Sequence, residues 1–129
     1  MIMLAHIDVP PVTTTCKPRV YVAGPYTTPD PDTNVRTAVR AADELLKIGC
    51  TPFVPHLTHL WNQISPKGWR EWIDYDLEWV AACHALLRLP GVSPGAELEV
   101  QFALKMGIPV FHSLAEVDEW VRNLSVGSS

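Results

Sequence analysis

The sequence predicts a single α/β domain with a mainly parallel sheet of four to five strands and helices on both faces. Short runs rich in β-branched and other apolar residues alternate with segments whose apolar residues recur at helical spacing. Gly or Pro follows several of these segments, which is typical of strand–helix connections. A chain of 129 residues is long enough for one hydrophobic core and too short for two.

The first half of the predicted domain contains two strands and one helix. Arg19–Ala23 (RVYVA) is rich in strand-forming residues and ends at Gly24-Pro25. After a loop rich in Pro, Thr and Asp, Asn34–Gly49 shows helical spacing, and its final glycine suits a helix C-terminus. Thr51–Val54 is the second strand, and residues 56–67 are expected to form a long connection.

The second half of the predicted domain alternates two helices with two further strands. Trp69–His84 and Pro94–Gly107 both show helical spacing of apolar residues. Ala85–Leu89 (ALLRL) lies between them and is expected to be the third strand, followed by a turn at Pro90–Ser93. Ile108–His112 (IPVFH) is the fourth strand.

A last helix is expected over Leu114–Leu124. Ser113 suits its N-cap and Glu116 follows three residues later, which is the pattern of a capping box. The chain is therefore expected to consist of three parts, namely an irregular leader over residues 1–17, the domain over 18–124 and a loose tail over 125–129.

This alternation predicts a flavodoxin/Rossmann-like arrangement. Strands that alternate with helices form a parallel sheet covered on both faces, and ligands bind such sheets at the carboxyl ends of the strands. In this chain those ends are Ala23–Tyr26, Pro55-His56 and Pro90–Gly95. We therefore expect the functional residues to come from these three segments and the helices beside them.

Composition and charge exclude several classes of function. The net charge of −4 and the absence of a Lys or Arg cluster argue against nucleic acid as a partner. No apolar run approaches the length of a membrane span, and the N-terminus lacks the features of a signal peptide. Cys16, Cys50 and Cys83 are odd in number and widely spaced, which favours reduced, buried thiols. We expect a cytoplasmic protein with no membrane partner.

Two carboxylates lie on the apolar sides of their predicted helices. Glu99 falls opposite the polar arc of its helix, and Asp76 falls among apolar residues that include Trp72 and Val80. An unpaired carboxylate in apolar surroundings costs several kcal/mol or takes up a proton. The pair therefore indicates an active site.

The turn before Glu99 has the features of an anion-binding site. Ser93 suits a helix N-cap, Pro94 suits the first helical position, and Gly95 lets a ligand approach the backbone. An ordinary capped helix is the alternative interpretation. With Glu99 one turn further on, the carboxylate is well placed to attack the carbon of a sugar whose phosphate or hydroxyl the turn holds.

Other residues near the strand ends have both structural and functional interpretations. Tyr21 is either a core residue or a hydrogen-bond donor that orients a carboxylate. The aromatic residues of His56–Trp61, with Trp69 and Trp72, either stack on a nucleobase or belong to the core or to a subunit interface. His56 and His59 lack a third ligand at suitable spacing, so we expect no metal, and we expect no other cofactor.

Three of these segments resemble the nucleoside 2-deoxyribosyltransferase family, which includes the nucleoside 5'-monophosphate N-hydrolases. They are Tyr21–Tyr26 (YVAGPY), Asp76–Trp79 (DLEW) and Ser93–Glu99 (SPGAELE), the last followed by Ala103. The resemblance covers about residues 18–112 and implies an α/β enzyme. It implies that Glu99 is a nucleophile that forms a covalent glycosyl-enzyme.

The resemblance also implies roles for other residues. Asp76 matches the aspartate that protonates the leaving base or binds the sugar, and Tyr21 matches the tyrosine that bonds the nucleophile. Ser93 stands six residues before Glu99, where the monophosphate hydrolases are similar in having a serine and the transferases an aspartate. The expected substrate-binding residues come from the three strand ends and the aromatic segment: Gly24, Pro25, Tyr26, His56, Trp61, Ser93 and Gly95.

The function that follows is hydrolysis of the N-glycosidic bond of a nucleoside 5'-monophosphate, with release of the free base. Transfer of a deoxyribosyl group between bases, cleavage of NAD-like dinucleotides and a non-catalytic nucleotide sensor are the alternatives. Because the loop after Gly24 offers only hydroxyl groups, Arg36, Lys67 or a partner subunit would supply a cation to a phosphate. The resemblance and the Trp-rich helix imply a homodimer or a higher homo-oligomer.

Overall fold

The structure, a computed structural model, describes residues 17–127. Most of the predicted leader, including Cys16, lies outside these residues. The described part contains four strands, five α-helices and one 3₁₀ helix, in this order: β1 (Arg19–Ala23), α1 (Pro31–Ile48), β2 (Thr51–Phe53), η2 (Pro55–Thr58), α2 (His59–Ile64), α3 (Trp69–Ala81), β3 (Ala85–Arg88), α4 (Pro94–Lys105), β4 (Val110–Phe111) and α5 (Leu114–Gly127). No helix among these residues is long and apolar enough to cross a bilayer.

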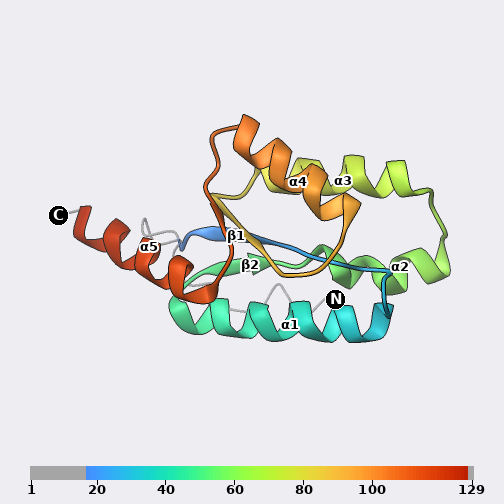
Figure 1. Cartoon of the computed structure of the whole chain (residues 1–129), viewed down its shortest axis with the longest axis horizontal. Coiled ribbons are helices and arrows are strands. Elements are labelled where there is room, and N and C mark those ends of the chain that lie inside the picture. Colours follow the sequence, from blue (N-terminus) through green and yellow to red (C-terminus); the bar gives the residue numbers. More distant parts are fainter. Residues whose placement is uncertain (1–16, 128–129) are drawn as a thin grey trace, which may run out of the picture.

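The four strands form one parallel sheet in the order β2-β1-β3-β4. Helices α1 and α5 cover one face of the sheet, and α3 and α4 cover the other (Figure 1). The predicted α/β class, the parallel sheet and the two helical layers are confirmed. The strand order is that of a flavodoxin-like sheet with four strands, in which β1 and β3 are the two central strands.

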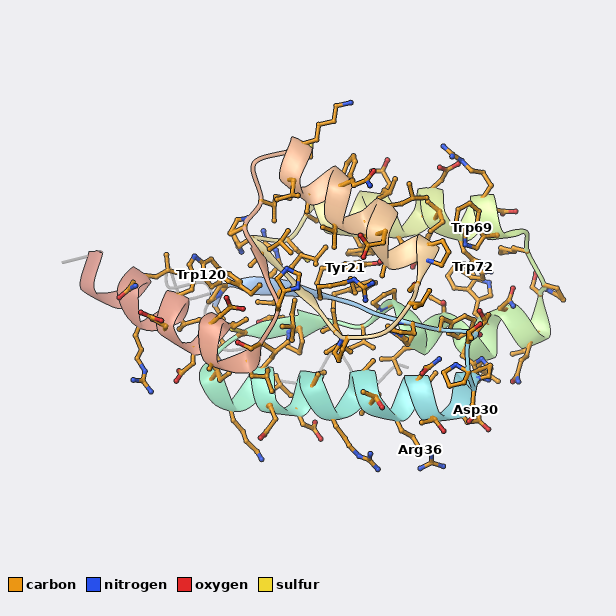
Figure 2. The ribbon with its side chains drawn as sticks, in the orientation of Figure 1. Tyr21, Asp30, Arg36, Trp69, Trp72 and Trp120 are labelled. Atoms are coloured by element: carbon orange, nitrogen blue, oxygen red, sulfur yellow. The ribbon has the colours of Figure 1, made fainter. Side chains whose placement is uncertain are left out.

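Successive residues of β1 point to opposite faces and contribute to two separate cores. Val20 and Val22 are buried against α1 and α5, together with Leu45 of α1. Tyr21 and Ala23 are buried in the other core, which α3 and α4 cover. Figure 2 shows Tyr21 in the middle of the molecule, between the two helical layers. The register of β1 thus places the tyrosine on the face that carries the predicted acidic residues.

The described helix ends follow from their capping residues. Asp30 accepts a hydrogen bond from the Thr33 amide at 3.0 Å and Pro31 begins the helix, so α1 starts three residues before the predicted Asn34. Gly49 ends α1 with a φ of 104°, as its position predicts. At the start of α5, Ser113 accepts from the Glu116 amide, while the Glu116 carboxylate accepts from the amide of His112.

Besides the start of α1, several predicted boundaries were wrong: strands β2 and β3 each end one residue early and α4 ends two residues early, at Lys105. Helix α5 continues to Gly127, so residues 125–127 are helical rather than part of a loose tail. Helix α3 stops at Ala81 and not at His84, because the backbone of His84 pairs with Arg19 at the start of β1. Strand β4 contains only Val110–Phe111 of the predicted Ile108–His112.

The predicted connection over residues 56–67 contains a 3₁₀ turn and a short helix instead, η2 and α2. Its apolar residues Leu57, Leu60 and Ile64 are exposed, whereas His56 is buried. The sequence did not reveal α2 because the expected helix packs its apolar side on the core, whereas the apolar side of α2 faces outward.

The burial of α1 gives a direct test of the fold. Leu45 is fully buried and its neighbour Leu46 is 55% exposed. We expect Leu45→Ala to lower the free energy of unfolding by about 2–5 kcal/mol, because it leaves a cavity in the core. Leu46→Ala should change it by less than about 0.5 kcal/mol. Urea denaturation measures both, and equal effects would contradict the described orientation of α1.

Candidate active site

A pocket lies at the carboxyl ends of the two central strands, β1 and β3. The chain leaves β1 for α1 on one face and leaves β3 for α4 on the other, so the two loops separate and a crevice opens between them. The two loops come close to each other at Gly91 and Pro25. A Cβ on Gly91, which has a φ of 120°, would lie 2.6 Å from Cγ of Pro25, so glycine is required there.

The pocket has a volume of about 160 Å³, roughly ten times the room that one water needs. Seven of the residues predicted from the sequence line it: Gly24, Tyr26, His56, Asp76, Ser93, Gly95 and Glu99. The structure therefore brings together residues from all three predicted strand ends and from both predicted acidic helices.

The other three predicted residues lie behind or beside the pocket. Tyr21 is fully buried behind Glu99. Pro25 packs on Gly91, and its carbonyl accepts a hydrogen bond from Nε2 of His56 at 3.0 Å. Trp61 does not line the pocket, but its ring packs edge-on against Trp72, which does. These residues shape the pocket from outside.

Glu99 is the most buried carboxyl group of the site. It lies on the second turn of α4, is 5% exposed, and accepts a hydrogen bond from the Tyr21 hydroxyl at 2.8 Å. Burial, the largest cause, and the nearby Asp76 carboxylate raise the pKa of Glu99 to about 8, although the Tyr21 hydrogen bond and the Arg88 charge act to lower it. Burial also raises the pKa of Tyr21, which keeps its hydroxyl a donor.

Asp76 faces Glu99 from α3. Burial raises its pKa to about 6, and its Oδ1 is buried with no hydrogen-bond partner among residues 17–127. Because two carboxylates so close together repel each other, they titrate as a pair that holds one proton near neutral pH. One ionised and one protonated carboxyl group at the floor of a pocket can act as a nucleophile and an acid.

The turn at the start of α4 has the predicted capping. Ser93 Oγ accepts from the Ala96 amide at 3.1 Å, and its carbonyl accepts from the Glu97 amide at 3.0 Å. The amide of Gly95 donates to no acceptor among the described residues, as is usual in the first turn of a helix. Gly95 also lets α3 approach, because a Cβ there would lie 3.3 Å from Ile73.

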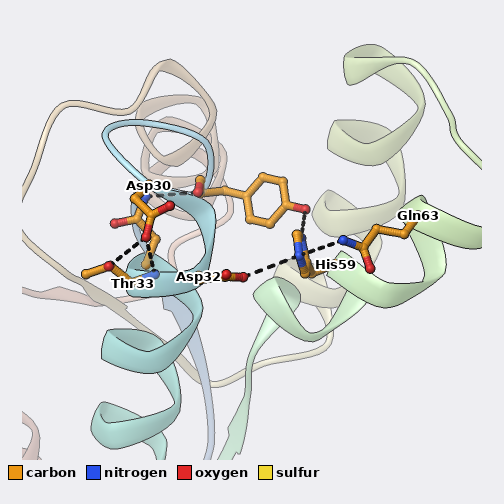
Figure 3. Close-up of polar contacts among 7 residues, drawn as sticks. Asp30, Asp32, Thr33, His59 and Gln63 are labelled. Carbon is orange, nitrogen blue, oxygen red and sulfur yellow. Dashed lines mark hydrogen bonds and ion pairs between the residues drawn. The ribbon is translucent and has the colours of Figure 1, made fainter.

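A chain of hydrogen bonds closes one side of the pocket. The Tyr26 hydroxyl bonds Nδ1 of His59, joining the loop after β1 to α2, and Nε2 of His59 contacts Gln63 and Asp32 (Figure 3). His59 therefore serves as a link between two walls. No group of three or more His, Cys, Asp or Glu that suits a metal occurs within residues 17–127.

The aromatic wall of the pocket comes from α3, and its two tryptophans are residues for which the sequence allowed either stacking on a nucleobase or packing in the core or an interface. Trp69 and Trp72 both line the pocket, near the start of α3 (Figure 2). The indole of Trp72 donates to Asn62 Oδ1 at 2.7 Å, and this bond fixes the ring. Asn62, which also lines the pocket, was missed because it lies in the segment predicted to be a long connection.

The expected phosphate-binding cations are not at the pocket. Arg36 points away from the outer side of α1 in Figure 2, and Lys67 lies over the Trp61 ring at 5.8 Å. Among the described residues, no Lys or Arg lines the pocket. Arg88, the last residue of β3, is buried beneath the loop whose residues line the pocket.

Residues 18–113 match the family model described as a domain of unknown function, DUF7768. The chain belongs to the DUF7768 family. None of the curated proteins compared with this DUF7768 domain matches it. Its cysteines within the described residues, Cys50 and Cys83, are free and buried, as predicted.

Two solved structures share the fold of this DUF7768 domain. A 2-deoxyribosyltransferase from Bacillus psychrosaccharolyticus superposes with a TM-score of 0.55 at 18% identity, over 78% of this chain and 90% of its own. A 2-deoxyribosyltransferase from Leishmania mexicana gives the same TM-score and identity, over 72% of this chain and 61% of its own. The fold that the three sequence motifs implied is therefore confirmed.

The raised pKa values predict how the stability of this DUF7768 domain depends on pH. Asp76 and Glu99 bind protons more tightly in the folded than in the unfolded chain. The pair therefore stabilises the fold at pH 4, and this contribution is lost as the pH rises through about 6 to 8, with a slope of roughly 1 kcal/mol per pH unit and proton. Chemical denaturation of the wild type and Glu99→Gln at pH 5 and pH 8 measures it. An unchanged slope in the variant would contradict the assignment.

Proposed function

We propose that this chain cleaves the N-glycosidic bond of a nucleoside 5'-monophosphate, with Glu99 as the nucleophile. The observation that carries the proposal is the buried Tyr21–Glu99 hydrogen bond of 2.8 Å beside Asp76, at a pocket. A carboxyl group that is 5% exposed needs a reason to be there, since burial of an ionised carboxylate is costly. The fold shared with two 2-deoxyribosyltransferases supports a reaction at the same bond.

The reaction proceeds in two displacements. Because the pKa of Glu99 is higher than that of Asp76, the shared proton first passes from Glu99 to Asp76. The ionised Glu99 then attacks C1' of the sugar, and the bond from C1' to the base nitrogen breaks. Its electron pair goes to the base, which takes a proton from Asp76 and leaves as the free base. Water then attacks C1' of the glycosyl-glutamate, gives a proton to Asp76, and releases the sugar phosphate and the Glu99 carboxylate. The two displacements retain the configuration at C1'.

Tyr21 and the turn before α4 position the reacting groups. The Tyr21 hydroxyl holds Oε2 of Glu99 and favours the ionised form, which is the nucleophilic one. The free Gly95 amide and the Ser93 hydroxyl lie at a helix N-terminus and can donate to the 5'-phosphate. The aromatic rings of Trp69 and Trp72 offer flat surfaces for the base.

Transfer of a deoxyribosyl group between bases is the second candidate. The observation that favours it is the lack of Lys and Arg among the described residues that line the pocket, because a free nucleoside needs no cation. Both solved neighbours are 2-deoxyribosyltransferases, and the bacterial one is described as a biocatalyst for the synthesis of nucleosides. In this reaction a second base, in place of water, attacks the glycosyl-glutamate.

We also propose that the chain forms a homo-oligomer through its α2 surface. Leu57, Leu60 and Ile64 are each more than 60% exposed and lie on consecutive turns of η2 and α2, with Trp61 beside them. Exposed apolar side chains grouped in this way are typical of an interface. The same helix forms a wall of the pocket through Asn62, so a partner subunit would lie close to the bound ligand.

The proposed function is tested with a panel of nucleosides, their 5'-monophosphates and an NAD-like dinucleotide. Chromatography measures the free base that the protein releases from each compound. We expect the wild type to release base and Glu99→Gln to lose at least about a thousandfold in rate. Mass spectrometry should detect the glycosyl-enzyme on the wild type. Addition of a second base to the assay distinguishes transfer, which forms a new nucleoside, from hydrolysis.

Asp74→Asn is the matched control, because Asp74 lies on α3 two residues before Asp76 but is exposed and paired with Arg70. Its rate should equal that of the wild type. If folded Glu99→Gln still releases base, the nucleophile assignment is wrong. If the wild type binds nucleotides and cleaves none of them, the chain is a sensor and not an enzyme.

The oligomer has its own test. Ile64 is 75% exposed on α2, and a charge there should prevent an apolar interface from forming. We expect the wild type to run as a dimer or larger species in size-exclusion chromatography with light scattering, and Ile64→Glu to run as a monomer. Leu124→Glu, at a position 44% exposed on α5, should leave the assembly intact. A monomeric wild type would refute this proposal.

A further inference from the structure

Arg88 is a buried charge that the proposed reaction does not use. It is the last residue of β3, lies opposite Ala23 of β1, and is only 8% exposed. A guanidinium is seldom buried unless all its surroundings are arranged to bond it. The partners of Arg88 therefore indicate what it is for.

Every hydrogen bond of the Arg88 side chain goes to the loop and helix that follow it. It donates to the carbonyls of Leu89 and Gly91, the latter at 3.0 Å. It also donates to Oε1 of Glu97, at 2.8 Å from Nη2 and 3.3 Å from Nε. Arg88 thus joins the beginning of the loop to the first turn of α4.

The segment between these two attachment points lines the pocket. It consists of residues 92–96 and includes Ser93 and Gly95, the proposed donors to the 5' end of the substrate. On the Arg88 side the segment is held at Gly91 and Glu97, and Gly91 is held from the other side by its contact with Pro25. We propose that Arg88 is a positioning residue that holds residues 92–96 in the conformation that binds the sugar end of the substrate. This inference rests on the proposed function.

Arg88 also contributes to the charge balance around Glu99. The groups that face Glu99 are Tyr21 from β1, Asp76 from α3 and Arg88 from β3, and Cys83 lies near Tyr21. Arg88 brings the one positive charge among them, and it favours the ionised form of Glu99. The ion pair with Glu97 is half open to solvent, since the Glu97 side chain is 58% exposed, so it only partly cancels the charge of Arg88.

Two substitutions separate the positional effect from the charge effect. Arg88→Met removes both. Arg88→Lys keeps the charge but replaces the planar guanidinium, whose Nε, Nη1 and Nη2 all donate, by one ammonium nitrogen that cannot reproduce these bonds together. We expect KM to rise about tenfold or more in both variants, because the binding turn loses its attachment. The acidic limb of the pH profile of kcat/KM should move to higher pH in Arg88→Met alone. Arg122→Met, which breaks an exposed ion pair on α5, is the control.

Hydrogen exchange of the amides of residues 91–97 provides a readout that needs no activity. We expect exchange at least tenfold faster than in Arg122→Met for both Arg88 variants, and unchanged exchange in α1. KM values or exchange rates equal to those of the control would overturn the inference. If the wild type cleaves no compound of the panel, the proposed function fails, and exchange alone then decides the role of Arg88. If Arg88→Met does not fold, Arg88→Lys carries the test.

Discussion

The central strand β1 is the constraint on which the rest of the structure depends. It is paired on both edges and covered on both faces, so the four residues 20–23 have no access to solvent. Three of them are apolar. The fourth, Tyr21, brings a hydroxyl into the core, and a buried hydroxyl needs a hydrogen-bond partner. Glu99 is that partner, so one bond connects the centre of the sheet to the floor of the pocket.

This bond also explains why the acidic pair tolerates burial. Burial of either ionised carboxylate alone would cost free energy, and two ionised carboxylates together would repel each other. Sharing a proton removes one charge, and the Tyr21 bond and the Arg88 guanidinium stabilise the other. The site is therefore built from groups on β1, β3, α3 and α4, and its geometry depends on the packing of all four elements.

The spacing of apolar residues along the sequence predicted the strands and helices that bury one face in the core. Strand β1 was predicted with its observed bounds, and the helices that carry Asp76 and Glu99 were predicted because their apolar residues recur every three or four positions. The same helical spacing showed that Asp76 and Glu99 lie on the apolar sides of their helices. Helix α2 was missed for the converse reason, since its apolar residues face out.

The remaining features depend on contacts between distant residues, which periodicity does not report. The pairing of His84 with Arg19 ends α3 early, and nothing local to His84 signals it. Arg88 reads as one polar residue in an apolar strand, and only the path of the following loop gives it its four donor contacts. Trp72 was predicted from the sequence as a residue that could stack on a base, whereas Asn62 was not singled out. Their direct bond, however, joins two separate helices.

Electrostatics link the proposed oligomer to the proposed substrate. Ser93 and Glu99 are six residues apart on one helix, a rise of about 9 Å. At that distance two like charges repel each other by about 2 kcal/mol if the effective dielectric constant is near 20. The repulsion between a phosphate dianion and the ionised carboxylate is therefore about 4 kcal/mol. The attraction of the helix N-terminus for an anion offsets at most about 2 kcal/mol of this repulsion. Arg88, buried beneath the loop, offsets part of this repulsion. Since no described residue that lines the pocket is Lys or Arg, the proposed monophosphate substrate would gain from a further cation, which the proposed partner subunit would supply. The isolated subunit is suited to the uncharged 5'-hydroxyl of a nucleoside, and an assembly that brings a cation to the pocket is suited to the phosphate.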